Sequence, residues 1–113
     1  MATEKKKISA RAKGNSFELA CIKKLKEIGF TECASTRSCN RWLDSQKVDI
    51  VGVEGWNIQC KAVEKLGSIH AILESMPKTG KNVVLHKKNR QGVTATMPME
   101  VFLELLALSI DRK

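Results

Sequence analysis

Two short apolar runs joined by a glycine-containing turn constrain the fold of this chain more than any other segment. The runs cover residues 47–53 and 56–63, and Glu54 and Gly55 separate them. This pattern predicts a β-hairpin. In the second run apolar residues alternate with polar ones, so one face of that strand is expected in a core. The residues expected on the core face are Trp56, Ile58 and Cys60.

Helical and extended patterns on both sides of the hairpin predict an α/β fold. A helix is expected over residues 16–27, with Asn15 as its N-cap and Gly29 at its end. The further elements expected are a strand at 30–37, a loop at 38–46, a helix at 68–76, strands at 82–86 and 92–96, and a last helix opened by Pro98. The predicted order, α-β-β-β-α-β-β-α, describes a mixed β-sheet flanked by helices.

The two ends of the chain differ in character. At 113 residues the chain is expected to form one domain, over residues 14–113. Residues 1–13 form a basic arm that could either bind phosphates or act as a solubilising tail. The last helix has an apolar side from Val101 to Leu108. That side could pack in the core or cover a partner, and we expect the core.

Composition favours a polyanionic partner. The net charge is +8, and no long apolar run or basic amphipathic helix is present, so nucleic acid is expected rather than a membrane. A basic surface that serves solubility alone is the alternative. The four cysteines show no C-x-x-C spacing, so we do not expect a zinc site. The charged N-terminus lacks an apolar leader, so we expect a reduced, intracellular protein.

Three polar residues in the hairpin form a candidate site. Gln59 and Lys61 are two apart on one strand and project from the same face. Asp49 lies within an apolar strand, where a carboxylate needs a partner or a metal. The alternatives are a solvent-facing lysine and a strand-edge aspartate paired with a lysine.

The register of the hairpin decides whether these residues meet. A two-residue turn pairs residues whose numbers sum to 109, and Asp49 then faces Cys60 on the core side. A three-residue turn, or a bulge at Gly52, is expected to give a sum of 110. We predict this second arrangement, with Asp49 opposite Lys61 and Val51 opposite Gln59.

Oxygen ligands of this kind suit Mg²⁺, which assists phosphodiester cleavage. Asp49 is expected to be the central ligand, with the amide oxygen of Gln59 and the carbonyl of Cys60 in reach. Lys61 would orient the water or stabilise charge in the transition state. Glu18 is a possible third member because it lies beside core-facing Phe17. Glu18 could instead cap the helix together with the residue three positions before it, and the two roles conflict.

These residues occur in an order that resembles a known family. Residues 13–18 (Lys-Gly-Asn-Ser-Phe-Glu), then Ile28-Gly29-Phe30, then Asp49, then Gln59-Cys60-Lys61 resemble the PD-(D/E)XK nuclease superfamily. The most similar branch is the archaeal-type Holliday junction resolvases and their phage relatives. The resemblance spans about residues 13–62. Val48 replaces the motif's proline, and a glutamine replaces the usual acid, as in Mrr-like restriction nucleases.

The resemblance implies a restriction-endonuclease-like fold and a homodimeric, Mg²⁺-dependent endonuclease in which Mn²⁺ can substitute. It implies Glu18, Asp49 and Gln59 as ligand positions and Lys61 as catalytic. It also implies that residues 35–46 border DNA. The expected location is the cytoplasm or nucleoid, or the host's cytoplasm for a phage protein. The residues expected to contact DNA are Lys13, Arg37, Ser38, Arg41, Lys87, Lys88 and Arg90. The expected substrate is a four-way junction. A restriction- or repair-type nuclease and a catalytically weak DNA-binding module are the alternatives.

Overall fold

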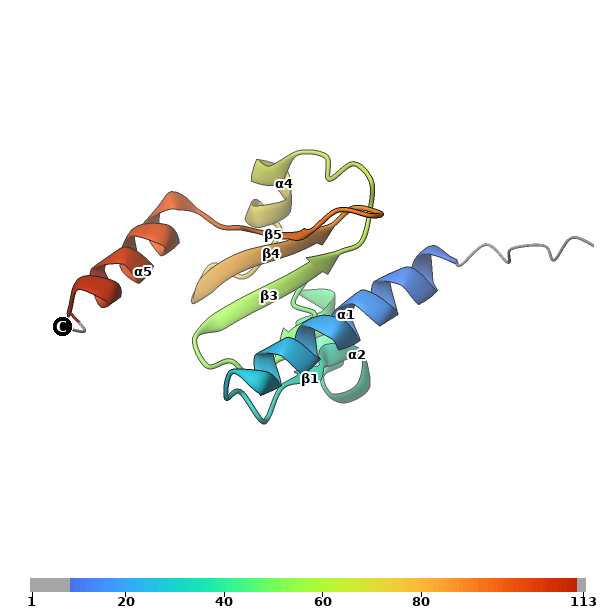
Figure 1. Ribbon diagram of the computed structural model, residues 1–113, viewed down its shortest axis with the longest axis horizontal. Coiled ribbons are helices and arrows are strands. Elements are labelled where there is room, and N and C mark those ends of the chain that lie inside the picture. The colour runs from blue at the N-terminus through green and yellow to red at the C-terminus, as the bar shows by residue number, and fades with distance from the viewer. Residues whose placement is uncertain (1–8, 112–113) are drawn as a thin grey trace, which may run out of the picture.

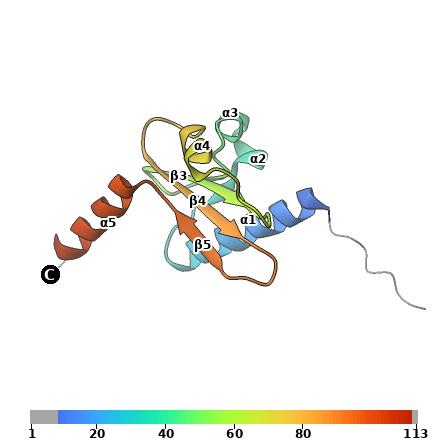
Figure 2. The ribbon, with the colours of Figure 1, turned by 90° about the horizontal axis from the view of Figure 1, so that it is seen from above.

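A computed structural model describes residues 9–111 of the chain. Its elements are, in order, α1 (Ala10–Glu27), β1 (Ala34–Ser35), α2 (Thr36–Cys39), α3 (Arg41–Ser45), β2 (Ile50–Val51), β3 (Trp56–Lys61), α4 (Ile69–Glu74), β4 (Lys81–Lys87), β5 (Val93–Thr96) and α5 (Met99–Asp111). The fold is mixed α/β. Helix α1 lies on one side of the sheet, and α2, α3 and α4 lie on the other (Figure 2).

The five strands form one mixed sheet in the order β1-β2-β3-β4-β5. The pairs β1–β2, β2–β3 and β4–β5 are antiparallel, whereas β3 and β4 are parallel and joined through α4. Strand β3 is therefore central, and Gln59 and Lys61 stand beside Val84 and His86 of β4. The carboxyl ends of β3 and β4 meet at the same edge of the sheet (Figure 1).

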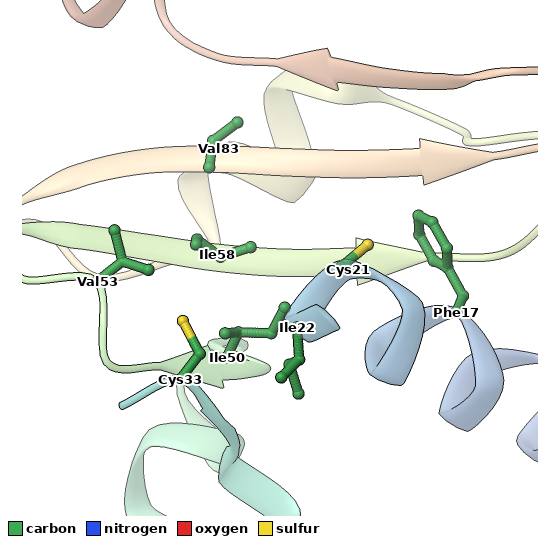
Figure 3. Packing of buried hydrophobic residues seen from close by; sticks show 8 residues of the cluster. All are labelled: Phe17, Cys21, Ile22, Cys33, Ile50, Val53, Ile58 and Val83. Atoms are coloured by element: carbon green, nitrogen blue, oxygen red, sulfur yellow. The ribbon is translucent and has the colours of Figure 1, made fainter. Parts of the chain in front are cut away.

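The hydrophobic core lies between α1 and the sheet. Phe17, Cys21 and Ile22 of α1 pack against strands β2, β3 and β4 (Figure 3). The other buried members are Cys33, Ile50, Val53, Ile58 and Val83. Trp56 and Cys60 pack against this cluster, which confirms the predicted core face of β3.

Helix α1 begins six residues earlier than predicted. Its N-cap is Ser9, whose side chain accepts a hydrogen bond from the backbone nitrogen of Ala12. Asn15 lies inside the helix, so the predicted cap at Asn15, and with it the capping role of Glu18, is wrong. The glycine at position 14 does not end the helix, because a single glycine costs about 1 kcal/mol there. Residues 10–13 of the predicted arm are helical, and residues 1–8 lie outside the described part.

The segment between α1 and β2 is more helical than predicted. The strand expected at 30–37 is limited to β1, and the expected loop at 38–46 contains the short helices α2 and α3. Side-chain caps explain both helices. Ser35 Oγ accepts from the Arg37 nitrogen, and Asn40 Oδ1 accepts from the Leu43 nitrogen. Such caps leave no hydrophobic periodicity by which to recognise them.

The hairpin has a register that neither predicted turn gives. The Trp56 nitrogen donates to the Val53 carbonyl, which closes a two-residue turn. Ile50 nevertheless pairs with Ile58, so paired numbers sum to 108 rather than 109 or 110. An extra residue on the first strand, near Gly52 at φ +97°, causes this shift. The prediction that Asp49 lies opposite Lys61 is therefore wrong, although the residues of each face are unchanged because 108 and 110 have the same parity.

Helix α5 projects away from the sheet in both views (Figures 1 and 2). Val101 is buried, but Phe102, Leu106 and Leu108 are 46–55% exposed, so the prediction that this apolar side enters the core is wrong. Pro98 accepts the first hydrogen bonds of the helix and Glu104 pairs with Lys81 at 3.5 Å, which hold α5 in this direction. Within residues 9–111, no helix combines the length and apolar character needed to cross a membrane.

Candidate functional site

Asp49 is held between helix α2 and strand β3. Its backbone nitrogen donates to the Ile58 carbonyl at 2.7 Å, and its carbonyl accepts from the Thr36 nitrogen at 3.0 Å. Its side-chain Oδ2 accepts from the Cys60 nitrogen at 2.8 Å. Because Ile50 and Ile58 are paired and point into the core, the adjacent Asp49 points to the other face. Its carboxylate therefore lies on the face of Gln59, in a fixed position.

Burial raises the pKa of the Asp49 carboxyl above its ordinary value of 3.8. The hydrogen bond from the Cys60 nitrogen opposes this shift, and the negative charges of Glu18 and Asp44 add to it. The positive charge of Lys61 favours the ionised form. Asp49 is thus a carboxylate among acids, partly removed from water. A bound cation would favour its ionised form.

Glu18 approaches from α1, on the core side of the sheet, and its negative charge acts on Asp49. It is 7% exposed, and its Oε1 accepts from Ser35 Oγ at 3.1 Å and from Arg37 Nε at 3.1 Å. Arg37 Nη2 also lies 3.1 Å from that oxygen. All three contacts engage Oε1, which leaves Oε2 to take another ligand. Ser35 and Arg37 therefore orient the carboxylate, as outer residues commonly orient metal ligands.

Gln59 carries an unpaired buried oxygen. The residue is 5% exposed, and among the described residues its Oε1 has no hydrogen-bond partner. Buried polar atoms are almost always paired, because leaving one unpaired costs about 1–3 kcal/mol. Since Gln59 alternates with Ile58 and Cys60, which face the core, its side chain lies on the same face as the Asp49 carboxylate. An unpaired amide oxygen of this kind is one of the oxygen ligands that Mg²⁺ accepts.

Lys61 and Cys60 complete the predicted set. Lys61 is half-buried on the face of Gln59, and its charge acts on Asp49. The nitrogen of Cys60 is directed toward β2, so its carbonyl is directed to the same side. The thiol of Cys60 instead faces the core, where the thiol of Cys21 and burial raise its pKa far above the ordinary value. That thiol is therefore neutral and is not a ligand.

The sequence predicted no role in the metal site for two residues near Asp49, Thr36 and Asp44. Thr36 is fully buried and donates from Oγ1 to the Val48 carbonyl at 2.7 Å. Its Oγ1 also lies 3.3 Å from Asp44 Oδ1, which brings a third acid into the neighbourhood. Asp44 lies three residues after Arg41 in a stretch without apolar periodicity. An acid in such a stretch is too common to predict a functional residue. Within residues 9–111, no group of three or more His, Cys, Asp or Glu side chains could hold a metal.

The predicted DNA contacts fall into two groups. Lys13 of α1 donates to Asn89 Oδ1 at 3.1 Å, which joins it to the β4–β5 turn. Lys88 and Arg90 lie in that turn, and Lys87 ends β4 directly before it. The second group lies on α2 and α3, where Arg37 is engaged with Glu18, Ser38 Oγ donates to the Ser35 carbonyl, and Arg41 is exposed. The first group borders the carboxyl ends of β3 and β4, and the second borders Glu18.

The site combines two oriented carboxylates, an unpaired amide oxygen and a lysine. Comparisons of the chain with protein-family models, curated proteins and solved structures give no match. Two carboxylate oxygens and an amide oxygen can hold a divalent cation, and cations on both sides can hold a phosphate backbone.

Proposed function

We propose that the protein is a Mg²⁺-dependent endodeoxyribonuclease with a restriction-endonuclease-like fold. The observation that carries the proposal is the buried, unpaired Oε1 of Gln59 on the face of Asp49. An amide oxygen in that state destabilises the fold unless a cation or donor occupies the site. The pKa of Asp49 is raised, so its ionised carboxylate is also destabilised unless a cation or donor lies beside it.

Each residue has a defined part in this proposal. Asp49, the Oε2 of Glu18, the Oε1 of Gln59 and the Cys60 carbonyl would hold the cation. When bound, a divalent cation offsets the charge of the scissile phosphate and lowers the pKa of water. Lys61 donates hydrogen bonds to the attacking water or to the developing negative charge. Arg37, Lys13 and the β4–β5 turn bind the backbone phosphates on either side.

A four-way or branched DNA is the proposed substrate, and a homodimer is the proposed assembly. The support for the substrate is the resemblance of residues 13–62 to junction resolvases together with the net charge of +8. A dimer would present two sites for two symmetrical nicks. The presence of Gln59 in place of an acid favours one alternative function. An amide brings one negative charge fewer than a carboxylate, so the site would bind a cation more weakly. That alternative is a DNA-binding module with little or no cleavage, while a restriction- or repair-type nuclease would use the same site.

Cleavage of labelled DNA tests the proposal. Wild type, Asp49→Asn and Lys61→Ala are compared on four-way junction, flap, linear duplex and single-stranded DNA with Mg²⁺ or Mn²⁺. Cleavage is expected to fall about 100-fold or more in both variants. The control is Lys78→Ala, which removes an exposed lysine after α4 and should cleave as wild type does. Equal cleavage by wild type and Asp49→Asn would refute the site. Cleavage of linear duplex as fast as junction would refute the substrate, and salt-sensitive binding without cleavage would support the binding module.

A further inference from the structure

One side of α5 carries an exposed apolar stripe, of which Met99 also lines a hollow beside α4. Met99, Phe102, Leu103, Leu106 and Ile110 recur at helical spacing and share this side. They are between 46% and 69% exposed, whereas Val101 on the opposite side is 6% exposed. The helix thus rests on its domain through Val101 and presents its more apolar side outward.

An apolar groove lies on the other part of the molecule, beside α1. It is lined by Phe17, Ala20, Leu25, Ile28, Leu85 and Val93 and encloses about 420 Å³. A second hollow of about 270 Å³ shares Leu25 and Leu85 with it, so the two form one groove along α1. Ile28 is 73% exposed and Val93 is 52% exposed. We refer to this combined surface as the α1 groove.

Helix α5 is directed away from the α1 groove of its own chain. The helix follows Thr96 at the end of β5, and Glu104 pairs with Lys81 at the start of β4. The groove instead includes Val93 at the start of β5 and Lys87 at the end of β4. About 20 Å of strand separates those ends of β4. Both ribbon views show α5 pointing outward from the sheet (Figures 1 and 2).

We propose that the apolar stripe of α5 docks into the α1 groove of a second copy of this chain, in a reciprocal exchange. The two surfaces are complementary in charge as well as in apolar character. Glu100 lies beside the stripe, and Lys24 and Lys87 line the groove. This arrangement covers both unpartnered surfaces with one two-fold symmetric contact.

The buried area is sufficient for a specific dimer. A large apolar side chain has an area of about 200 Å², so the five half-exposed members of the stripe offer about 500 Å². Two such stripes and the grooves that they cover bury on the order of 2,000 Å² in total, which lies at the upper end of standard interfaces. The inference deepens the homodimer that is part of the proposed function. It does not depend on metal-dependent cleavage, because no residue of the candidate metal site takes part, although Lys87 belongs both to the groove and to the proposed phosphate-binding group.

Sedimentation and light scattering of the full chain test the assembly. At about 10 µM the wild type is expected to show a molecular mass twice that of one 12.6 kDa chain. The Leu106→Glu variant is expected to be monomeric. Leu108→Glu is the matched control, since Leu108 is 55% exposed on the opposite side of α5 and should remain dimeric. On the groove side, Ala20→Glu should dissociate the dimer, and Leu19→Glu, one residue away and outside the groove, should not. A monomeric wild type, or equal effects of target and control substitutions, would overturn the proposal.

Photo-crosslinking identifies the contact itself. A benzophenone amino acid at position 106, in a mixture of ¹⁵N-labelled and unlabelled chains, should crosslink to α1 or β5 of the other copy. Crosslinks to α5 of the other copy would show that two stripes pair, and crosslinks within one chain would show that α5 folds back. Either result would overturn the proposal without bearing on DNA cleavage.

Discussion

Replacement of Gln59 by methionine is expected to stabilise the protein in the absence of divalent cations. Gln59 is 5% exposed and its Oε1 has no partner among the described residues. An unpaired buried acceptor costs about 1–3 kcal/mol. Methionine has nearly the same length and flexibility, and its thioether needs no hydrogen bond. The free energy of unfolding should therefore rise by about 1–2 kcal/mol.

Thermal unfolding in EDTA, followed by circular dichroism, measures this change. For a domain of about 100 residues, 1 kcal/mol shifts Tm by about 4–8 °C. Asn57→Leu is the matched control, because Asn57 is on the same strand and face but its amide is satisfied. Its Nδ2 donates to the Thr79 carbonyl at 2.7 Å and to Asn82 Oδ1 at 2.8 Å. Asn57→Leu should therefore lower the stability by about 1–2 kcal/mol.

Addition of Mg²⁺ should reverse the order of stability. A ligand at 100 times its Kd stabilises the folded state by about 2.7 kcal/mol. Wild type should gain this amount, and Gln59→Met should lose most of it together with its ligand oxygen. If Gln59→Met were as destabilised in EDTA as Asn57→Leu, the amide oxygen would be paired in solution and the reasoning would fail. If Mg²⁺ stabilised wild type and Gln59→Met equally, Gln59 would not be a ligand.

Further substitutions test the surroundings of the site. Because burial raises the pKa of Asp49, the folded protein holds this proton more tightly than the unfolded chain, and stability falls as pH rises from 3.8 through the raised pKa. The Tm advantage of Asp49→Asn over wild type should therefore grow with pH; a constant difference would contradict this. Gly52→Ala should cost more than about 2 kcal/mol in urea unfolding, because its Cβ would lie 2.5 Å from a backbone oxygen, whereas Gly14→Ala, with nothing within 4 Å, should gain about 0.5–1 kcal/mol. Arg37→Met should cost about 1–2 kcal/mol, and a double-mutant cycle with Glu18→Gln should show the loss to be shared; additive losses would exclude their coupling.

The sequence predicted which residues share a face better than it predicted which residues stand opposite each other. The alternation of Trp56, Ile58 and Cys60 is a property of one strand and could be read directly. The pairing of Ile50 with Ile58 depends on how Gly52 passes the backbone of residues 32–33, which is a tertiary contact without a local signal. Asp49 kept its predicted face because the error in register was an even number.

Other differences have similar causes. The start of α1 at Ala10 and the helices α2 and α3 depend on side-chain caps from Ser9, Ser35 and Asn40, and such residues are equally common in loops. The state of Gln59 was also not predictable, because burial on the second face depends on helices that pack there. The apolar side predicted for α5 included Val101 and Leu108, which lie opposite the exposed stripe, and spacing alone does not distinguish a side that enters a core from one that stays exposed.

The order of the strands has a consequence for how the site forms during folding. The paired residues Ile50 and Ile58 are eight positions apart in the sequence, whereas the paired residues Trp56 and Lys81 are 25 positions apart. Short loops close at a lower entropic cost and sooner. In pulse-labelled hydrogen exchange, the amides of Asp49 and Cys60 should therefore gain protection before those of β4. Asp49 would therefore reach its final position while the rest of the sheet is still unfolded. The positive charges of the β4–β5 turn would join it later.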